Sequence, residues 1–144
     1  MPNTSDSPSL INVLTPTCPS RMTLKIIADK WALLVVFALK HESRRNGELL
    51  RLISDVTQKM LTQTLRKLEQ SGIVERIIYH EVPPKVEYRL TALGRSLLVP
   101  INAISEWAET HYAEVIAAQQ RHAYRDDPTT DLADLADLPT NDAR

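Results

Sequence analysis

The sequence contains one cysteine, Cys18, and only three glycines among its 144 residues. A single cysteine excludes an internal disulfide framework and a cysteine-based zinc cluster. Three scattered glycines exclude a glycine-rich phosphate-binding loop. The four histidines do not show the spacing of metal ligands. We therefore expect neither a cofactor nor a metal, and no catalytic site.

Long hydrophobic runs are also absent. The longest, WALLVVFAL at residues 31–39, is far shorter than the ~20 apolar residues of a membrane-spanning helix. The first residues, MPNTSDSPS, lack the basic start and apolar core of a signal peptide. These features predict a soluble cytoplasmic protein with no membrane partner.

The charges are divided unevenly along the chain. Residues 21–95 carry 14 Lys/Arg against 8 Asp/Glu, whereas residues 96–144 carry 3 against 9. A basic block followed by an acidic one is typical of a polyanion-binding module with an acidic appendage. Ordinary solvated faces would give the same count, so charge leaves both interpretations open.

The first half of the basic block has helical spacing. Proline favours the first position of a helix, so Pro19 predicts a helix over residues 19–28. Asp29 can cap a second helix over residues 30–41. A third, short helix is predicted over residues 46–53.

A fourth helix, residues 57–71, has the clearest pattern. Thr57 is a good N-cap, and Gly72 stands where a left-handed glycine ends a helix. The inward positions are leucines at i, i+4 and i+7, namely Leu61, Leu65 and Leu68. Two short helices joined by a tight turn indicate a helix-turn-helix.

Beyond Gly72 the period changes to that of strands. Residues 73–80 are β-branched and aromatic, and residues 86–90 alternate between apolar and charged side chains. The prolines of the intervening EVPPK cannot donate ladder hydrogen bonds, so they predict a stiff loop with Lys85 at its tip. The expected fold is mainly α with a small β-hairpin wing (α+β), a winged helix-turn-helix.

Residues 91–118 return to helical spacing, and Pro100 should kink this helix or divide it. Its apolar stripe exceeds what one small domain can cover, which predicts a symmetric dimer. The stripe contains Leu97, Ile101, Ile104, Ala108, Tyr112 and Val115. We expect a flexible arm at 1–17, a winged-helix domain with dimerisation helices at 18–123 and an acidic disordered tail at 124–144.

The outer face of helix 57–71 carries side chains of the kinds that read DNA bases. They are Gln58, Lys59, Thr62, Gln63 and Arg66. Glutamine pairs with adenine, arginine with guanine, and a threonine methyl group touches thymine. Thr57 and the first amides of the helix are candidates for phosphate contact. A solvated amphipathic helix would look similar.

Further phosphate or minor-groove contacts are predicted in the connecting segments, at Arg45, Arg76, His80 and Lys85. For each of them an ordinary surface charge is the alternative. Together with the helix-turn-helix, these residues predict a partner that is double-stranded DNA, with a pseudo-palindromic operator for a two-fold symmetric dimer.

Residues 18–107 resemble the HxlR family of MarR-related bacterial regulators. The resemblance is carried by the Cys-Pro start, Lys30-Trp31, KMLTQTLRKLE, PPKVEYRLTALG and Trp107. It implies a dimeric winged-helix transcription regulator with terminal helices in the dimer interface. Two departures are Ala28-Asp29, where the family usually has two glycines, and Asn46, where it usually has an aromatic residue.

The resemblance also implies a role for Cys18, because several such regulators sense oxidants or electrophiles through a cysteine at this position. With no second cysteine, the remaining chemistries are a Cys18–Cys18′ bond, a mixed disulfide with a small thiol, or alkylation. A helix N-terminus near Arg21 and Lys25 would favour the thiolate. The alternative is a buried, unreactive cysteine.

The expected function is a DNA-binding repressor or activator that responds through Cys18. Three alternatives remain open. The winged helix could serve protein contact only, regulation could come from a small ligand beside the dimer helices, or Cys18 could serve a small thiol enzyme.

Overall fold

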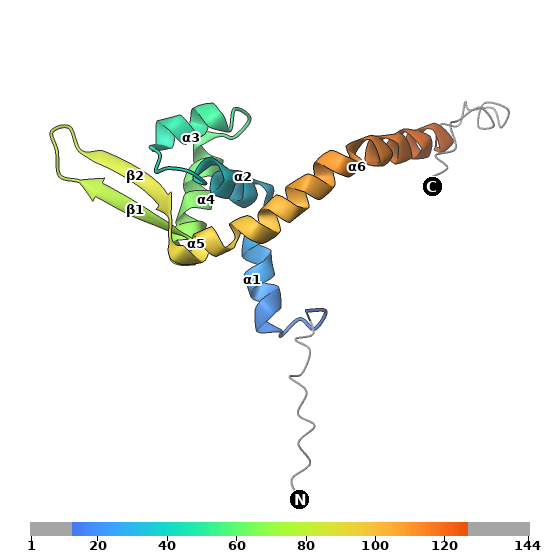
Figure 1. The fold of residues 1–144 in the computed structure, drawn as a ribbon, viewed down its shortest axis with the longest axis horizontal. Coiled ribbons are helices and arrows are strands. Elements are labelled where there is room, and N and C mark those ends of the chain that lie inside the picture. The colour runs from blue at the N-terminus through green and yellow to red at the C-terminus, as the bar shows by residue number, and fades with distance from the viewer. Residues whose placement is uncertain (1–12, 127–144) are drawn as a thin grey trace, which may run out of the picture. The chain divides into compact units, whose positions relative to one another are not determined.

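The structure, a computed structural model, describes residues 13–126, and these fall into two compact units that meet between Ile101 and Asn102. Most of the predicted arm and tail lies outside the described residues. The elements are α1 (Pro19–Ile27), α2 (Lys30–Ala38), α3 (Asn46–Leu52), α4 (Gln58–Gln70), β1 (Val74–Tyr79), β2 (Lys85–Leu90), α5 (Ala92–Ser96) and α6 (Leu98–Arg125) (Figure 1). The predicted mainly α fold with a β-hairpin wing is confirmed.

The helix starts follow the predicted capping residues. Asp29 accepts a hydrogen bond from the Trp31 backbone N–H (2.8 Å), and Thr57 accepts one from that of Met60 (3.1 Å). Cys18 occupies the N-cap position of α1, but its side chain makes no capping bond. Each oxygen cap satisfies one of the amides that a helix start leaves without a partner.

Helix α4 ends as the sequence predicts, at a left-handed glycine. Gly72 has φ +72°, and its N–H donates to the carbonyl of Glu69 (3.0 Å). The next N–H, that of Ile73, donates to the carbonyl of Leu68 (2.9 Å). This pair of bonds is the Schellman motif, which satisfies the last carbonyls of the helix and turns the chain directly into β1.

The wing is an antiparallel hairpin whose register runs from Val74↔Leu90 to Tyr79↔Lys85. Lys85 is therefore the first residue of β2, and the prediction that it lies in the loop at the tip is wrong. Pro83 and Pro84 cannot donate hydrogen bonds to the ladder. Lys85, the residue that follows them, has no such restriction and pairs with Tyr79. A further bridge, Arg44↔Tyr88, adds the segment before α3 to the open edge of β2.

The predicted division of the C-terminal helix is confirmed, although it falls before the proline. Helix α5 ends at Ser96 and α6 begins at Leu98, so Pro100 lies in the first turn of α6, where its missing N–H needs no partner. Helix α6 continues to Arg125, beyond the predicted end at 118, because no glycine or proline interrupts residues 119–125.

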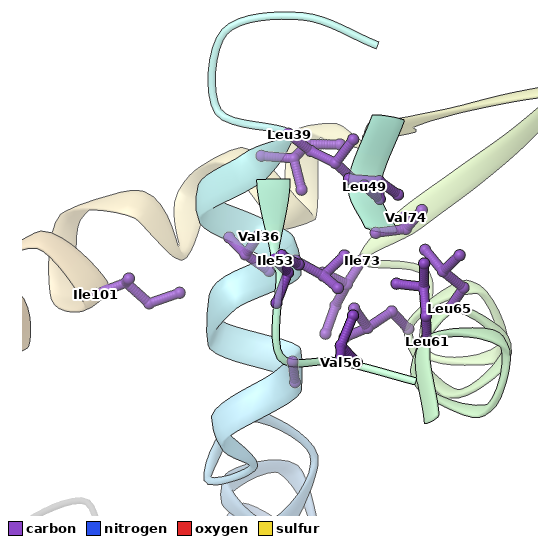
Figure 2. Close-up of a cluster of buried hydrophobic side chains, with 14 residues drawn as sticks. Val36, Leu39, Leu49, Ile53, Val56, Leu61, Leu65, Ile73, Val74 and Ile101 are labelled. Atoms are coloured by element: carbon purple, nitrogen blue, oxygen red, sulfur yellow. The ribbon is translucent and has the colours of Figure 1, made fainter. Parts of the chain in front are cut away.

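The core of the first unit lies between α2, α3, α4 and the base of the hairpin. Leu61, Leu65 and Leu68 of α4 are at most 1% exposed, as predicted. Figure 2 shows Leu61 and Leu65 with Val56 and Ile73 in this cluster, together with Ile101 from the first turn of α6. Each fully buried leucine contributes about 1.5–3 kcal/mol, so the inner face of α4 is firmly fixed.

The start of β1 is held to α5 by a compact set of contacts. The Thr91 N–H donates to the carbonyl of Ile73 (3.1 Å), and the Thr91 hydroxyl donates to that of Gly72 (2.5 Å). The same hydroxyl accepts from the Gly94 N–H (3.1 Å). A Cβ at Gly94 would lie 2.1 Å from the Ile73 carbonyl oxygen, so only glycine fits here.

We predict that Gly94→Ala lowers the free energy of unfolding by about 2–3 kcal/mol, because the obstructing atom belongs to the backbone and cannot rotate away. The matched control is Gly47→Ala, where the new Cβ meets only the end of the Arg51 side chain, at 3.9 Å. The control should be neutral or gain up to about 1 kcal/mol. Urea unfolding followed by circular dichroism measures both, and equal midpoints for Gly94→Ala and the unchanged protein would contradict the contact.

Candidate nucleic-acid interface

Helix α4 buries one face and presents the other to solvent. Gln58, Lys59, Gln63 and Arg66 are exposed, and Thr62 is half-buried. Within the part of the chain that the structure describes, no ion pair engages Lys59 or Arg66. The predicted reading residues therefore lie together on a rigid helix, with two cations that are free to meet an anionic partner.

Two of these side chains are bonded to each other. The Gln58 Nε2 donates to Thr62 Oγ1 (3.0 Å), and the Thr62 hydroxyl donates to the Gln58 carbonyl (2.8 Å). A base edge would have to replace the bond between the two side chains, whereas the amide of Gln63 is available directly. Among the glutamines of α4, Gln63 is the better placed for reading a base.

Thr57 has a structural role as the cap of α4. Its oxygen accepts from the Met60 N–H, and its own hydroxyl proton remains able to donate. A phosphate oxygen at the start of α4 could accept that proton without breaking the cap. The predicted phosphate role of Thr57 is therefore compatible with its capping role.

The predicted phosphate-contacting residues of the wing lie on different faces of the hairpin. Side chains alternate between faces along a strand, so the register places Tyr79, Lys85 and Glu87 on one face and Arg76 on the other. His80 follows β1 and is exposed. One face of the wing thus cannot present Arg76 and Lys85 together.

Lys85 is instead brought to Arg45. Both residues line a hollow of about 410 Å³ between the start of α3 and the hairpin, together with Arg51, Glu48 and Glu87. The backbone N–H of Arg45 donates to Glu48 Oε2 (2.7 Å), and Arg45 is exposed. Sequence reasoning missed Arg51, because only the folding back of the hairpin brings β2 beside α3.

Glu87 is the second residue that sequence reasoning missed. Its carboxylate accepts from Lys85 Nζ (2.8 Å), from Ser43 Oγ (2.7 Å) and from the Tyr79 hydroxyl (3.3 Å). The hydrogen bond from Lys85, followed by that from Ser43, holds the pKa of Glu87 below its usual value. The same bond to Glu87 raises the pKa of Lys85. At neutral pH the two groups therefore form an ion pair.

The thiol of Cys18 is buried in the single subunit, with the residue 8% exposed. The Cys18 N–H donates to the carbonyl of Thr15 (3.0 Å), and Arg21 Nη1 donates to that of Leu14 (3.1 Å). The turn at residues 13–17 is thus tied to α1 next to the thiol. Of the two predicted cations, Arg21 is engaged with this turn.

Two kinds of site are absent from the described residues. No group of three or more His, Cys, Asp or Glu residues within 13–126 is arranged to hold a metal ion. No helix in that range is long and apolar enough to cross a membrane.

Known proteins with this arrangement are transcriptional regulators. The chain is 40% identical over 112 residues to the uncharacterized HTH-type transcriptional regulator YtfH of Escherichia coli, covering 78% of this chain and 89% of YtfH. It also resembles the structure of a transcriptional regulator ytfH from Salmonella typhimurium (TM-score 0.69, 38% identity, 76% of this chain and 97% of that one). The fold and its relatives define a winged helix-turn-helix transcriptional regulator.

The family is defined as well. Residues 26–116 match the HxlR-like helix-turn-helix model, and the chain belongs to this family. A further similar structure is the redox regulator HypR in its oxidized form (TM-score 0.61, 43% identity), over 65% of this chain and 96% of HypR. The resemblance stated from the sequence is confirmed.

Proposed function

We propose that this regulator binds a pseudo-palindromic DNA operator as a homodimer and acts in the cytoplasm as a repressor or an activator. The observation that carries the proposal is the exposed polar face of α4, with Lys59, Gln63 and Arg66, opposite a fully buried leucine face. In this arrangement α4 enters a major groove. Residues 18–123 would hold the DNA-binding and dimerising parts, to which the structure adds the turn at residues 13–17, bonded to α1, and the end of α6 at Arg125.

The proposed backbone contacts come from the hairpin and its surroundings. Arg45 and Lys85 line one hollow, with Arg51 added by the structure. Arg76 and His80 would contact a different part of the duplex or none, because Arg76 lies on the other face of the sheet. Thr57 donates its hydroxyl proton to a phosphate at the start of α4, and Thr62 and Gln58 read bases after exchanging their mutual bond.

The homodimer rests on the apolar stripe of α6. Ile101 is buried in the core, but further along the stripe Ile104 is 57% exposed, Tyr112 is 66% exposed and Val115 is 39% exposed. Trp107, beside the stripe, is 58% exposed. Side chains of this size in one helix form an apolar patch that water solvates poorly. A second copy of α6 would cover it, and a two-fold dimer presents two copies of α4 to one duplex.

The proposal predicts that Gln63→Ala and Arg66→Ala each weaken binding to a duplex from upstream of the protein's own coding sequence by about tenfold, within the 1–3 kcal/mol of a base contact. Gln70→Ala, at the end of α4, is the matched control and should bind as the unchanged protein does. A mobility-shift titration measures all three.

A salt titration with random-sequence duplex tests the alternative of protein contact only. DNA binding gives a plot of log affinity against log salt that falls by about 0.9 for each neutralised phosphate. A slope near zero would show that the polar face of α4 serves another partner, and it would overturn the proposal.

We further infer that Cys18 makes the regulator responsive to oxidants or electrophiles. HypR, 43% identical to this chain, is a redox regulator by its name. The low exposure of Cys18 favours a small reagent, so a mixed disulfide with a small thiol or alkylation fits better than direct bonding to Cys18′. Either adduct is larger than the space the thiol occupies and would displace the turn at residues 13–17 from α1.

Cys18→Ser should bind DNA like the unchanged protein and lose its response to a quinone, which alkylates the thiol, and to diamide added together with glutathione, where diamide takes up the two electrons and two protons released as Cys18 and glutathione form a mixed disulfide. Mobility shifts with and without each reagent measure the response, and intact-mass spectrometry of the unchanged protein supplies the control for the adduct. An unchanged response in Cys18→Ser, or an adduct that leaves DNA binding unaltered, would refute the sensing role.

A small-ligand mechanism is the second candidate, favoured by a hollow of about 320 Å³ beside α1 and the end of α4. Met22 and Ile26 give it apolar walls, and Lys25 and Lys67 give it two cations. An apolar molecule with a carboxylate would fit this lining. Bound there, it would connect α1 with the reading helix.

A further inference from the structure

The ammonium group of Lys85 is already occupied in the absence of DNA. Its ion pair with Glu87 is partly shielded from water, with side chains that are 28% and 14% exposed respectively. The same ammonium lies 4.9 Å from the centre of the Tyr79 ring. A phosphate approaching the wing therefore meets a lysine whose charge is balanced by a carboxylate.

Glu87 has two hydrogen-bond partners besides Lys85. The bonds from Ser43 (2.7 Å) and Tyr79 (3.3 Å) come from two other segments of the chain, the residues before α3 and β1. Lysine, by contrast, has a long flexible stem and a single point charge. Of the two partners, Lys85 is the one that can move.

The hollow that Lys85 lines could hold a phosphate group, which would be an alternative anionic partner for its ammonium group. Arg45 and Arg51 line it, and no ion pair within residues 13–126 engages either guanidinium. The positive charge of Arg45 acts to lower the pKa of Lys85, in keeping with the place of both cations in the lining of one hollow. A phosphate bound between the arginines would lie within reach of the lysine.

We propose that Glu87 is an internal competitor of the DNA backbone for Lys85. When DNA binds, Lys85 exchanges the Glu87 carboxylate for a phosphate oxygen in the hollow lined by Arg45 and Arg51. Glu87 thereby lowers the affinity of the wing for any duplex, which leaves discrimination between sequences to α4. This inference rests on the proposed DNA binding.

The test uses Glu87→Gln in the full chain, because the single amide oxygen of glutamine can still accept from Ser43 and Tyr79, whereas its uncharged NH2 group cannot accept from Lys85. Binding to random-sequence duplex should tighten by about two- to fivefold at low salt, the range expected for one partly exposed ion pair. The salt slope should steepen by up to about 0.9. Glu81→Gln is the matched control, since it removes the same charge from the exposed loop of the wing.

The tightening must depend on Lys85. In a Lys85→Gln background, Glu87→Gln should have no larger effect than Glu81→Gln has. Weaker binding by Glu87→Gln, tightening no greater than the control's, or equal tightening without Lys85 would each overturn the proposal. Absence of salt-dependent binding by the unchanged protein would instead overturn DNA binding itself, and the competitor role with it.

A measurement on the unchanged protein does not depend on the folding of any variant. The ¹⁵N resonance of the Lys85 ammonium should shift when random duplex is added, because its acceptor changes from a carboxylate to a phosphate. A resonance that stays in place while DNA binds would show that Lys85 keeps Glu87, and would overturn the exchange.

Discussion

The carbonyl of Ile73 is the point on which the geometry of the first unit depends. It follows directly on the Schellman turn that ends α4, accepts the N–H of Thr91 after the hairpin, and closes against Gly94 of α5. The reading helix, the wing and the helix that leads to α6 are therefore joined within a few residues. Because these contacts involve backbone atoms, they hold the base of the wing against the end of α4 and the start of α5.

The open edge of the hairpin is also held in place, and this fixes where the charged side chains of the wing lie. The hairpin is paired with Arg44 on its open edge, and Ser43 of the same segment is bonded to Glu87. The ion pair of Lys85 therefore belongs to a fixed frame and not to a loose loop. A regulator with a net charge of -1 must bind a polyanion through local arrangement of its cations, since the whole chain provides no attraction. The exposed cations of α4 and the arginines beside the wing are the arrangement that we propose for this contact.

Much of the fold follows from local rules in the sequence. Helices α2 and α4 start at the predicted capping residues Asp29 and Thr57, and α4 ends at the predicted left-handed Gly72. The leucine spacing of α4 correctly predicts its buried face. Pro100 correctly predicts a break in the C-terminal helix. It does not predict that the break falls at Leu97, three residues before the proline.

The parts that could not be predicted are contacts between distant segments. The single bridge from Arg44 to Tyr88 has no periodicity to reveal it. Lys85 was placed in the loop because the prolines end the pattern, yet pairing with Tyr79 begins at the very next residue. Arg51 and Glu87 belong to the candidate site because the hairpin returns beside α3, which the sequence pattern does not show. Side-chain charge alone therefore identifies candidate contacts one by one and does not show which of them lie together.

The central claim is that two copies of α4 read one duplex from a two-fold dimer. Hydroxyl-radical footprinting on an operator selected from a random pool tests it most directly. The account predicts two equal protected patches related by two-fold symmetry, with centres about 34 Å apart or a multiple of that distance. A single protected patch, or uniform protection without symmetry, would contradict it.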